Sequence, residues 1–76
     1  MIVLNIPKNI GKTEMRAAID EWIIGENGER DRAILTRKLI DGIHFEELAE
    51  EFSLSVRHTK KIVRDRWQTL RQHFAP

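Results

Sequence analysis

The 76-residue sequence contains no cysteine and no tyrosine. The lack of cysteine excludes disulfide bridges and thiolate metal sites, and the lack of both residues excludes tyrosine and thiol nucleophiles. Even the longest apolar runs are short, as at Ile2-Val3-Leu4. A membrane-spanning helix needs about 20 apolar residues. We therefore expect a soluble, cytoplasmic protein that has no contact with a membrane.

Proline and glycine are also scarce, with two prolines and four glycines. Hydrophobic residues make up 41% of the chain and charged residues 33%, a balance that permits a folded core. A chain of this length forms one small domain that buries about 60% of the surface of its unfolded form. We expect an N-terminal arm at residues 1–12 and one compact domain at residues 13–76.

Both signs of charge occur throughout the sequence, but they are unevenly distributed between residues 1–54 and residues 55–76. The net charge is +1. Residues 1–54 contain seven Lys or Arg and eleven Asp or Glu, whereas residues 55–76 contain six Lys or Arg and one Asp. A basic C-terminal segment on an acidic body favours a polyanionic partner. On charge alone, a solvated basic helix face explains the pattern as well.

Hydrophobic spacing predicts an all-α fold, a compact bundle of about four helices preceded by the short extended arm. In the first helix, Thr13 is the expected N-cap, Trp22 and Ile23 face the core, and Gly25 ends the helix. The second helix is expected to stop at Gly42. The predicted helices cover residues 13 to about 24, 29–41, 45–52 and 55–73.

The third and fourth predicted helices form a helix-turn-helix core at residues 45–64. Ala49 suits a close helix crossing, Leu54 points inward from the break at 53–55, and Ser55 caps the fourth helix. The inner stripe of the fourth helix contains Thr59, Ile62, Val63, Trp67, Leu70 and Phe74. Its last three residues either close the core against the first helix or form the seam of a homodimer.

Four cations of the fourth helix share one face: Arg57, Lys60, Lys61 and Arg64. They are separated by three, one and three residues, which follows the helical repeat. Such a face, free of acids, suits the DNA major groove, where arginine and lysine read base edges and valine contacts a thymine methyl group. Ser55 and the first amides of the helix are placed to bind a phosphate. The predicted DNA-binding residues are Ser55, Val56, Arg57, His58, Lys60, Lys61 and Arg64.

The segments Glu29–Leu35, Gly42–Phe52 and Ser53–Val63 together resemble the fourth conserved region of bacterial sigma factors. That domain reads promoter elements by a helix-turn-helix, and small phage and mobile-element regulators are built on it. The chain departs from the family where Ser53 replaces the usual turn glycine, where His44 replaces a Ser or Thr cap, and where Thr59 replaces an aliphatic residue.

The resemblance implies a transcriptional regulator that binds double-stranded DNA and needs no cofactor. Since the other sigma regions are missing, it also leaves open an adaptor or decoy that binds RNA polymerase, or an accessory protein of recombination or DNA packaging. Enzymatic chemistry is not expected, because no base lies beside a nucleophile. A metal site is not expected either, since His44, His58 and His73 lack helical i, i+4 partners.

Overall fold

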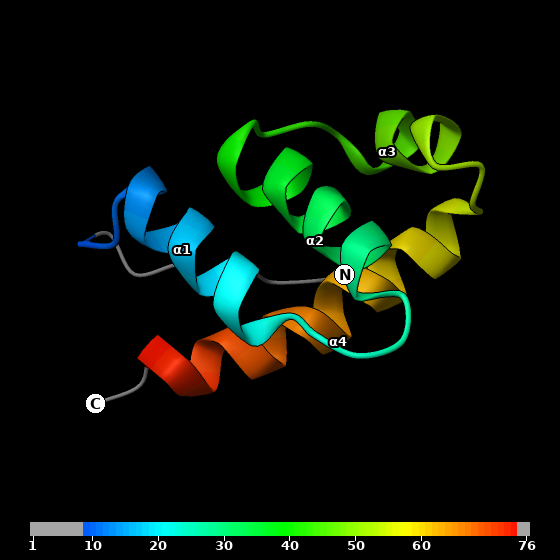
Figure 1. The fold of residues 1–76 in the computed structure, drawn as a ribbon. Helices are drawn as coiled ribbons and strands as arrows, with labels where there is room; N and C mark the ends of the chain where they lie inside the picture. The colour runs from blue at the N-terminus through cyan, green and yellow to red at the C-terminus, as the bar shows by residue number, and fades with distance from the viewer. Residues whose placement is uncertain (1–8, 75–76) are drawn as a thin grey trace.

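The computed structural model describes residues 9–74, which form an all-α bundle of four helices without any strand (Figure 1). Helix α4 runs the length of the molecule, α1 and α2 pack across it, and α3 lies over its N-terminal end. Residues 1–8 of the N-terminal arm expected at residues 1–12 lie outside the described residues, and Lys12 already belongs to helix α1. None of the helices among residues 9–74 is long and apolar enough to span a bilayer.

Helix α1 covers Lys12–Trp22, and its N-cap lies two residues earlier than the sequence predicted. The prediction of Thr13 as N-cap is wrong. Gly11 takes that position because its carbonyl accepts the first helical hydrogen bond, from Met15 N at 3.0 Å, and no side chain caps the helix. Gly25 has the expected left-handed backbone, with φ of +89°, but it lies in the loop beyond the C-cap residue Ile23.

Helix α2 covers Gly28–Leu35 and passes directly into a π-helical turn, η1, at Thr36–Ile40. One regular helix over residues 29–41 was predicted instead. The wider turn is visible in the hydrogen bond from Asp41 N to Thr36 O, at 3.2 Å, which spans five residues rather than four. Gly42 then ends the helical segment with φ of +72°, as the sequence predicted.

Helix α3 covers Phe45–Glu51 and helix α4 covers Val56–Phe74. The inner stripe of α4 is confirmed for Thr59, Ile62, Val63, Trp67 and Leu70, which are buried, while Phe74 at its end is half-buried against the core. Each large apolar side chain removed from water contributes about 1.5–3 kcal/mol. Trp67 and Leu70 are therefore buried within a single chain, which agrees with the prediction that they close the core. Their burial leaves neither side chain exposed for the seam of a homodimer.

The prediction that Trp22 belongs to the core is wrong. It was expected on the inward stripe of α1, yet it is 42% exposed, while Ile23 next to it is fully buried. The helix ends at Trp22, so the indole overhangs the bundle edge and lies against His73, with ring centroids 4.5 Å apart.

Candidate nucleic-acid interface

The turn between α3 and α4 sets the direction in which α4 leaves the bundle. Ser53 adopts φ of +56°, the left-handed conformation that favours glycine. Leu54 N then donates to Ala49 O at 2.8 Å, and the Leu54 side chain packs against the core. These contacts fix the start of α4 against the end of α3.

Ser55 caps α4, as the sequence predicted. Its Oγ accepts a hydrogen bond from His58 N at 3.0 Å, and its carbonyl accepts from Thr59 N at 3.0 Å and Thr59 Oγ1 at 2.8 Å. The hydroxyl hydrogen of Ser55 is still able to donate, because a serine hydroxyl is both donor and acceptor. Thr59, which stands where an aliphatic residue was expected, is fully buried and satisfied by this bond.

Six of the seven predicted DNA-binding residues line one open hollow of about 500 Å³ on the first half of α4. Its lining contains four cations and no carboxylate: Ser55, Arg57, His58, Lys60, Lys61 and Arg64. We call this surface the α4 face. The seventh residue, Val56, is half-buried beside it and does not line the hollow.

The cations of the α4 face have little to neutralise them. Arg64 Nε lies 3.4 Å from Asp65 Oδ1 in an exposed pair, and such pairs are worth about 0–1 kcal/mol. Lys60 Nζ lies 5.7 Å from the centroid of the Phe45 ring. Among the described residues, Arg57, Lys60 and Lys61 make no ion pair.

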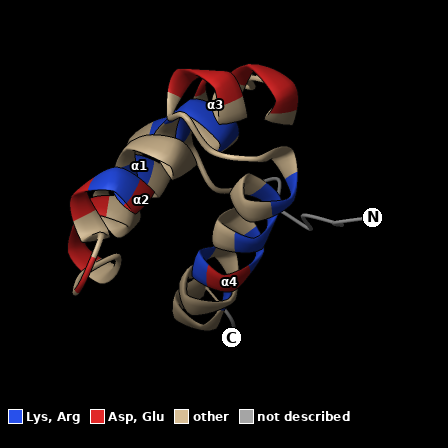
Figure 2. Ribbon diagram, turned by 90° about the vertical axis from the view of Figure 1, so that its right-hand side faces the viewer, with Lys and Arg blue, Asp and Glu red and all other residues tan. Residues whose placement is uncertain are grey.

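Apart from Asp65, the acidic side chains of the described residues lie outside α4. In the ribbon of Figure 2, the Asp and Glu positions, in red, dominate α3 at the top of the view, and Lys and Arg positions, in blue, recur along α4. Glu46, Glu47 and Glu50 are exposed on α3. The α4 face is therefore the surface of the bundle best suited to a polyanion.

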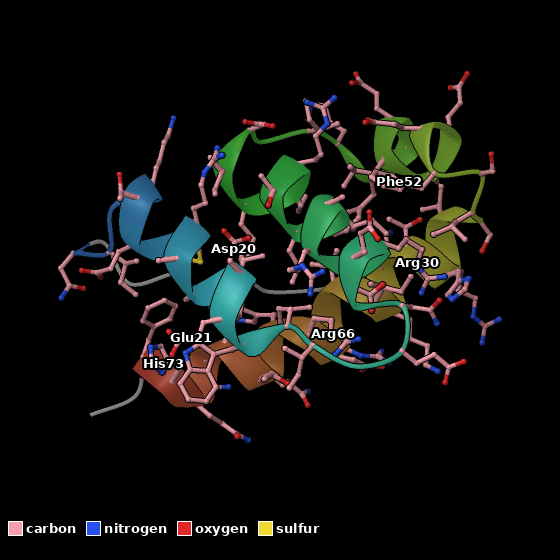
Figure 3. All side chains as sticks on the ribbon, viewed as in Figure 1. Asp20, Glu21, Arg30, Phe52, Arg66 and His73 are labelled. Atoms are coloured by element: carbon pink, nitrogen blue, oxygen red, sulfur yellow. The ribbon has the colours of Figure 1, made fainter. Side chains whose placement is uncertain are left out.

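Arg66 belongs to the same basic segment, but the structure gives it a different role. Its Nε donates to Asp31 Oδ2 at 2.7 Å, and its Nη1 and Nη2 donate to the carbonyls of Ile24 and Glu26, each at 3.2 Å (Figure 3). Asp31 is only 5% exposed and also accepts from Arg30 Nε at 3.1 Å. This anchor ties α4 to α2 and to the loop after α1.

The sequence analysis missed the anchor, because it counted Arg66 with the other cations of the segment. One signal was available. Arg66 lies nine residues after Arg57, which places it about 180° around the helix, on the side of the core. An arginine on a core-facing side needs a carboxylate partner, and Asp31 on α2 is that partner.

A second ion-pair group holds α3 against η1. Arg37 Nη2 lies 3.1 Å from Glu51 Oε2, and Arg37 Nη1 lies 3.3 Å from Asp41 Oδ2. The pKa of Arg37 is raised, first by its hydrogen bond to the Glu51 side chain and then by the bond to Asp41. Glu51 is therefore partly neutralised, which leaves Glu46, Glu47 and Glu50 as the uncompensated acids of α3.

No group of three or more His, Asp or Glu side chains among residues 9–74 is arranged to hold a metal ion.

The α4 face continues beyond Arg64. Gln68 and Arg71, both exposed, follow Arg64 at four and seven residues. This spacing extends the α4 face towards the C-terminus, and the sequence analysis did not include them.

Comparison with known proteins gives no match to a family model, to a curated protein or to a solved structure.

Proposed function

We propose that this protein is a sequence-specific DNA-binding transcriptional regulator that inserts α4 into the major groove as the reading helix of a helix-turn-helix. One observation carries the proposal. Arg57, Lys60, Lys61 and Arg64 converge with Ser55 and His58 on one hollow that has no carboxylate in its lining. The resemblance to the fourth region of sigma factors, stated above for three segments between residues 29 and 63, agrees with this function.

The dimensions of the face support the proposal. Arg57 and Arg64 are separated by seven residues, or about 10 Å along the helix axis. The major groove is about 12 Å wide and admits one α-helix. We expect Arg57, Lys60 and Lys61 to reach base edges, since they lie towards the N-terminal half of α4, and Arg64 to contact phosphate.

Affinity and sequence choice have different sources in this mechanism. Lysine and arginine contacts to phosphates release counterions and supply affinity without sequence preference. Hydrogen bonds from Arg57, Lys60 or Lys61 to base edges supply the preference. The Ser55 hydroxyl, at the N-terminus of α4, is expected to donate to a phosphate next to the groove.

Selection of bound duplexes from a random-sequence pool tests the proposed sequence preference. We expect one short motif to be enriched. The variant Arg57→Ala should bind the best site about 10–100-fold more weakly and lose its preference at one or two base pairs. The matched variant Arg16→Ala, an exposed arginine on α1, should select the same motif as the wild type. Failure to enrich any motif would exclude a sequence-specific reader.

A protein-interaction module is the second candidate function. The observation that favours it is the pair of exposed apolar side chains Trp22 and Ile24, 42% and 65% exposed. Neutralising Lys60, Lys61 and Arg64 separates the two functions, because it should abolish DNA binding and leave the fold and any protein contact at Trp22 and Ile24 intact.

A further inference from the structure

Residues 17–29, at the end of α1 and in the following loop, combine acidic and apolar character. The segment contains Asp20, Glu21, Glu26 and Glu29 and has no lysine or arginine. All four acids are exposed, and no ion pair within residues 9–74 engages them. The segment is therefore the counterpart of the α4 face, with the opposite charge.

Two large apolar side chains are exposed within this acidic segment. Trp22 is 42% exposed and Ile24 is 65% exposed, and the described residues contain no other large hydrophobic side chain that is exposed. The Trp22 indole lies on His73, at the C-terminal end of α4, and Figure 3 shows His73 and Glu21 at the same end of the molecule. We call Trp22, Ile24, Glu21 and Glu26 the α1 patch.

The cations nearest to the α1 patch are already committed to other groups. Arg32 Nη1 donates to Ile23 O at 2.7 Å, and Arg66 donates to Ile24 O, Glu26 O and the Asp31 carboxylate. Helices α1 and α4 both end here, and the C-terminal end of a helix dipole carries partial negative charge. Asp31 neutralises Arg66, and Glu21 and Glu26 outnumber Arg32, so the apolar side chains of the patch lie beside a net negative charge.

The α1 patch and the α4 face lie on opposite sides of α4. Arg66, which reaches the carbonyls of the patch loop, lies about 180° around the helix from Arg57, and His73 lies about 160° around from it. A two-fold axis through the patch would turn two α4 faces away from each other, so two copies joined there could not read one duplex together. This geometry disfavours a second copy as the occupant.

We propose that the α1 patch is a docking surface for a segment of another protein that presents an aliphatic or aromatic side chain flanked by lysine or arginine. The apolar side chain covers Trp22 and Ile24, and the cations pair with Glu21 and Glu26. The occupant binds on the side of α4 away from the α4 face, so both surfaces can be filled together. The choice of another protein over a second copy rests on the proposed DNA binding.

A library of random peptides displayed on phage, selected on the immobilised full chain, tests this proposal. We expect enrichment of peptides that place lysine or arginine next to leucine, isoleucine, phenylalanine or tryptophan. A synthetic peptide with the enriched sequence should shift the tryptophan emission to the blue, because Trp22 becomes covered while Trp67 is already only 5% exposed. The same peptide should bind the chain equally well when a DNA duplex is already bound.

Two variants and a matched control complete the test. Ile24→Ser should weaken peptide binding about tenfold, and it should keep the fold, because Ile24 is 65% exposed. The pair Glu21→Gln and Glu26→Gln should weaken it by a similar factor. The pair Glu46→Gln and Glu47→Gln, which removes the same charge from α3, should leave binding unchanged.

Three results would overturn the proposal: no enrichment over the bare support, enrichment of peptides without basic residues, or peptides whose affinity survives Ile24→Ser. Selection of acidic peptides would report binding to the α4 face and would also count against the patch. Self-association in sedimentation that Ile24→Ser abolishes would identify a second copy as the occupant instead.

Discussion

At the scale of single residues, the cations of α4 divide into two groups by the direction in which they point. Arg57, Lys60 and Lys61 are exposed on one side. Arg66 points to the other side and is held by Asp31 at 2.7 Å. Net charge does not distinguish these groups, although only the first can meet a polyanion. The second group orients α4 and so determines where the first group lies.

Asp31→Asn should therefore destabilise the fold. The substitution leaves the Arg66 guanidinium without its carboxylate, and breaking a buried ion pair costs about 3–5 kcal/mol. We expect the lower end of that range, about 3 kcal/mol, because the Arg66 side chain is 23% exposed. Urea denaturation gives the free energy of unfolding. Asp65→Asn, in the exposed pair with Arg64, should change it by less than about 1 kcal/mol, and equal effects of the two variants would contradict this assignment.

Ser55 permits a separate test, because it is both a helix cap and part of the α4 face. Aspartate also caps helices well, so Ser55→Asp should retain the stability of the wild type in a thermal melt. It places a negative charge in the hollow, so binding to duplex DNA should weaken by about tenfold or more. The control Ser55→Ala should show the reverse pattern, with about 1 kcal/mol of stability lost and a smaller loss of DNA binding. Unchanged DNA binding by Ser55→Asp would place the DNA elsewhere.

At the scale of elements, the turn between α3 and α4 contains Ser53, which stands where the resembling family has glycine. Ser53 has φ of +56°, and a residue other than glycine pays about 1–2 kcal/mol there. Ser53→Gly should raise the free energy of unfolding by up to about 1 kcal/mol, since it removes this strain. Ser53→Ala should not raise it, because alanine keeps the Cβ atom. Denaturation of the two variants side by side makes the comparison, and equal stability of the two would show that the turn is unstrained.

Most of the bundle could be predicted from the sequence, because the 3.6-residue periodicity of apolar side chains is a direct record of burial. The burial of Thr59, Ile62, Val63, Trp67 and Leu70 on α4 is confirmed for that reason. The Ser55 cap and the stop at Gly42 are confirmed because serine caps helices and glycine adopts the positive φ that ends them. The π-helical turn at Thr36–Ile40 could not be predicted in this way, since one residue of extra width does not alter the apolar spacing of a short segment.

The side chains that were placed wrongly lie at helix ends. Trp22 has the spacing of a core residue, but α1 ends there, and the indole, which lies against His73, stays 42% exposed. Similarly, Thr13 is a good capping residue by type, while the backbone already starts the helix at Lys12. The Asp31–Arg66 anchor joins residues 35 positions apart, and such a pairing depends on the packing of helices rather than on any local pattern. Of the candidate site, the sequence identified which residues share the α4 face and not what holds that face in position.

At the scale of the whole molecule, charge and apolar surface are separated on two sides of α4. The α4 face carries four cations in one hollow. The opposite side carries the acidic α1 patch with Trp22 and Ile24. A polyanion is attracted to one side and repelled by the other, so the molecule is suited to bind DNA in a single orientation. This arrangement leaves the α1 patch open to a protein partner.

The central claim, that the α4 face binds DNA, is tested most directly by the salt dependence of binding. Fluorescence anisotropy of a labelled duplex should show that log K falls with log salt at a slope of about −4 to −5, if four to six phosphates are contacted. The double variant Arg64→Gln, Arg71→Gln, which removes the two cations at the phosphate-contacting end of the α4 face, should make the slope shallower by about 2. The matched double variant Lys12→Gln, Arg16→Gln on α1 should keep the wild-type slope. Absence of binding at low salt by folded protein, or equal slopes for the two double variants, would contradict the account.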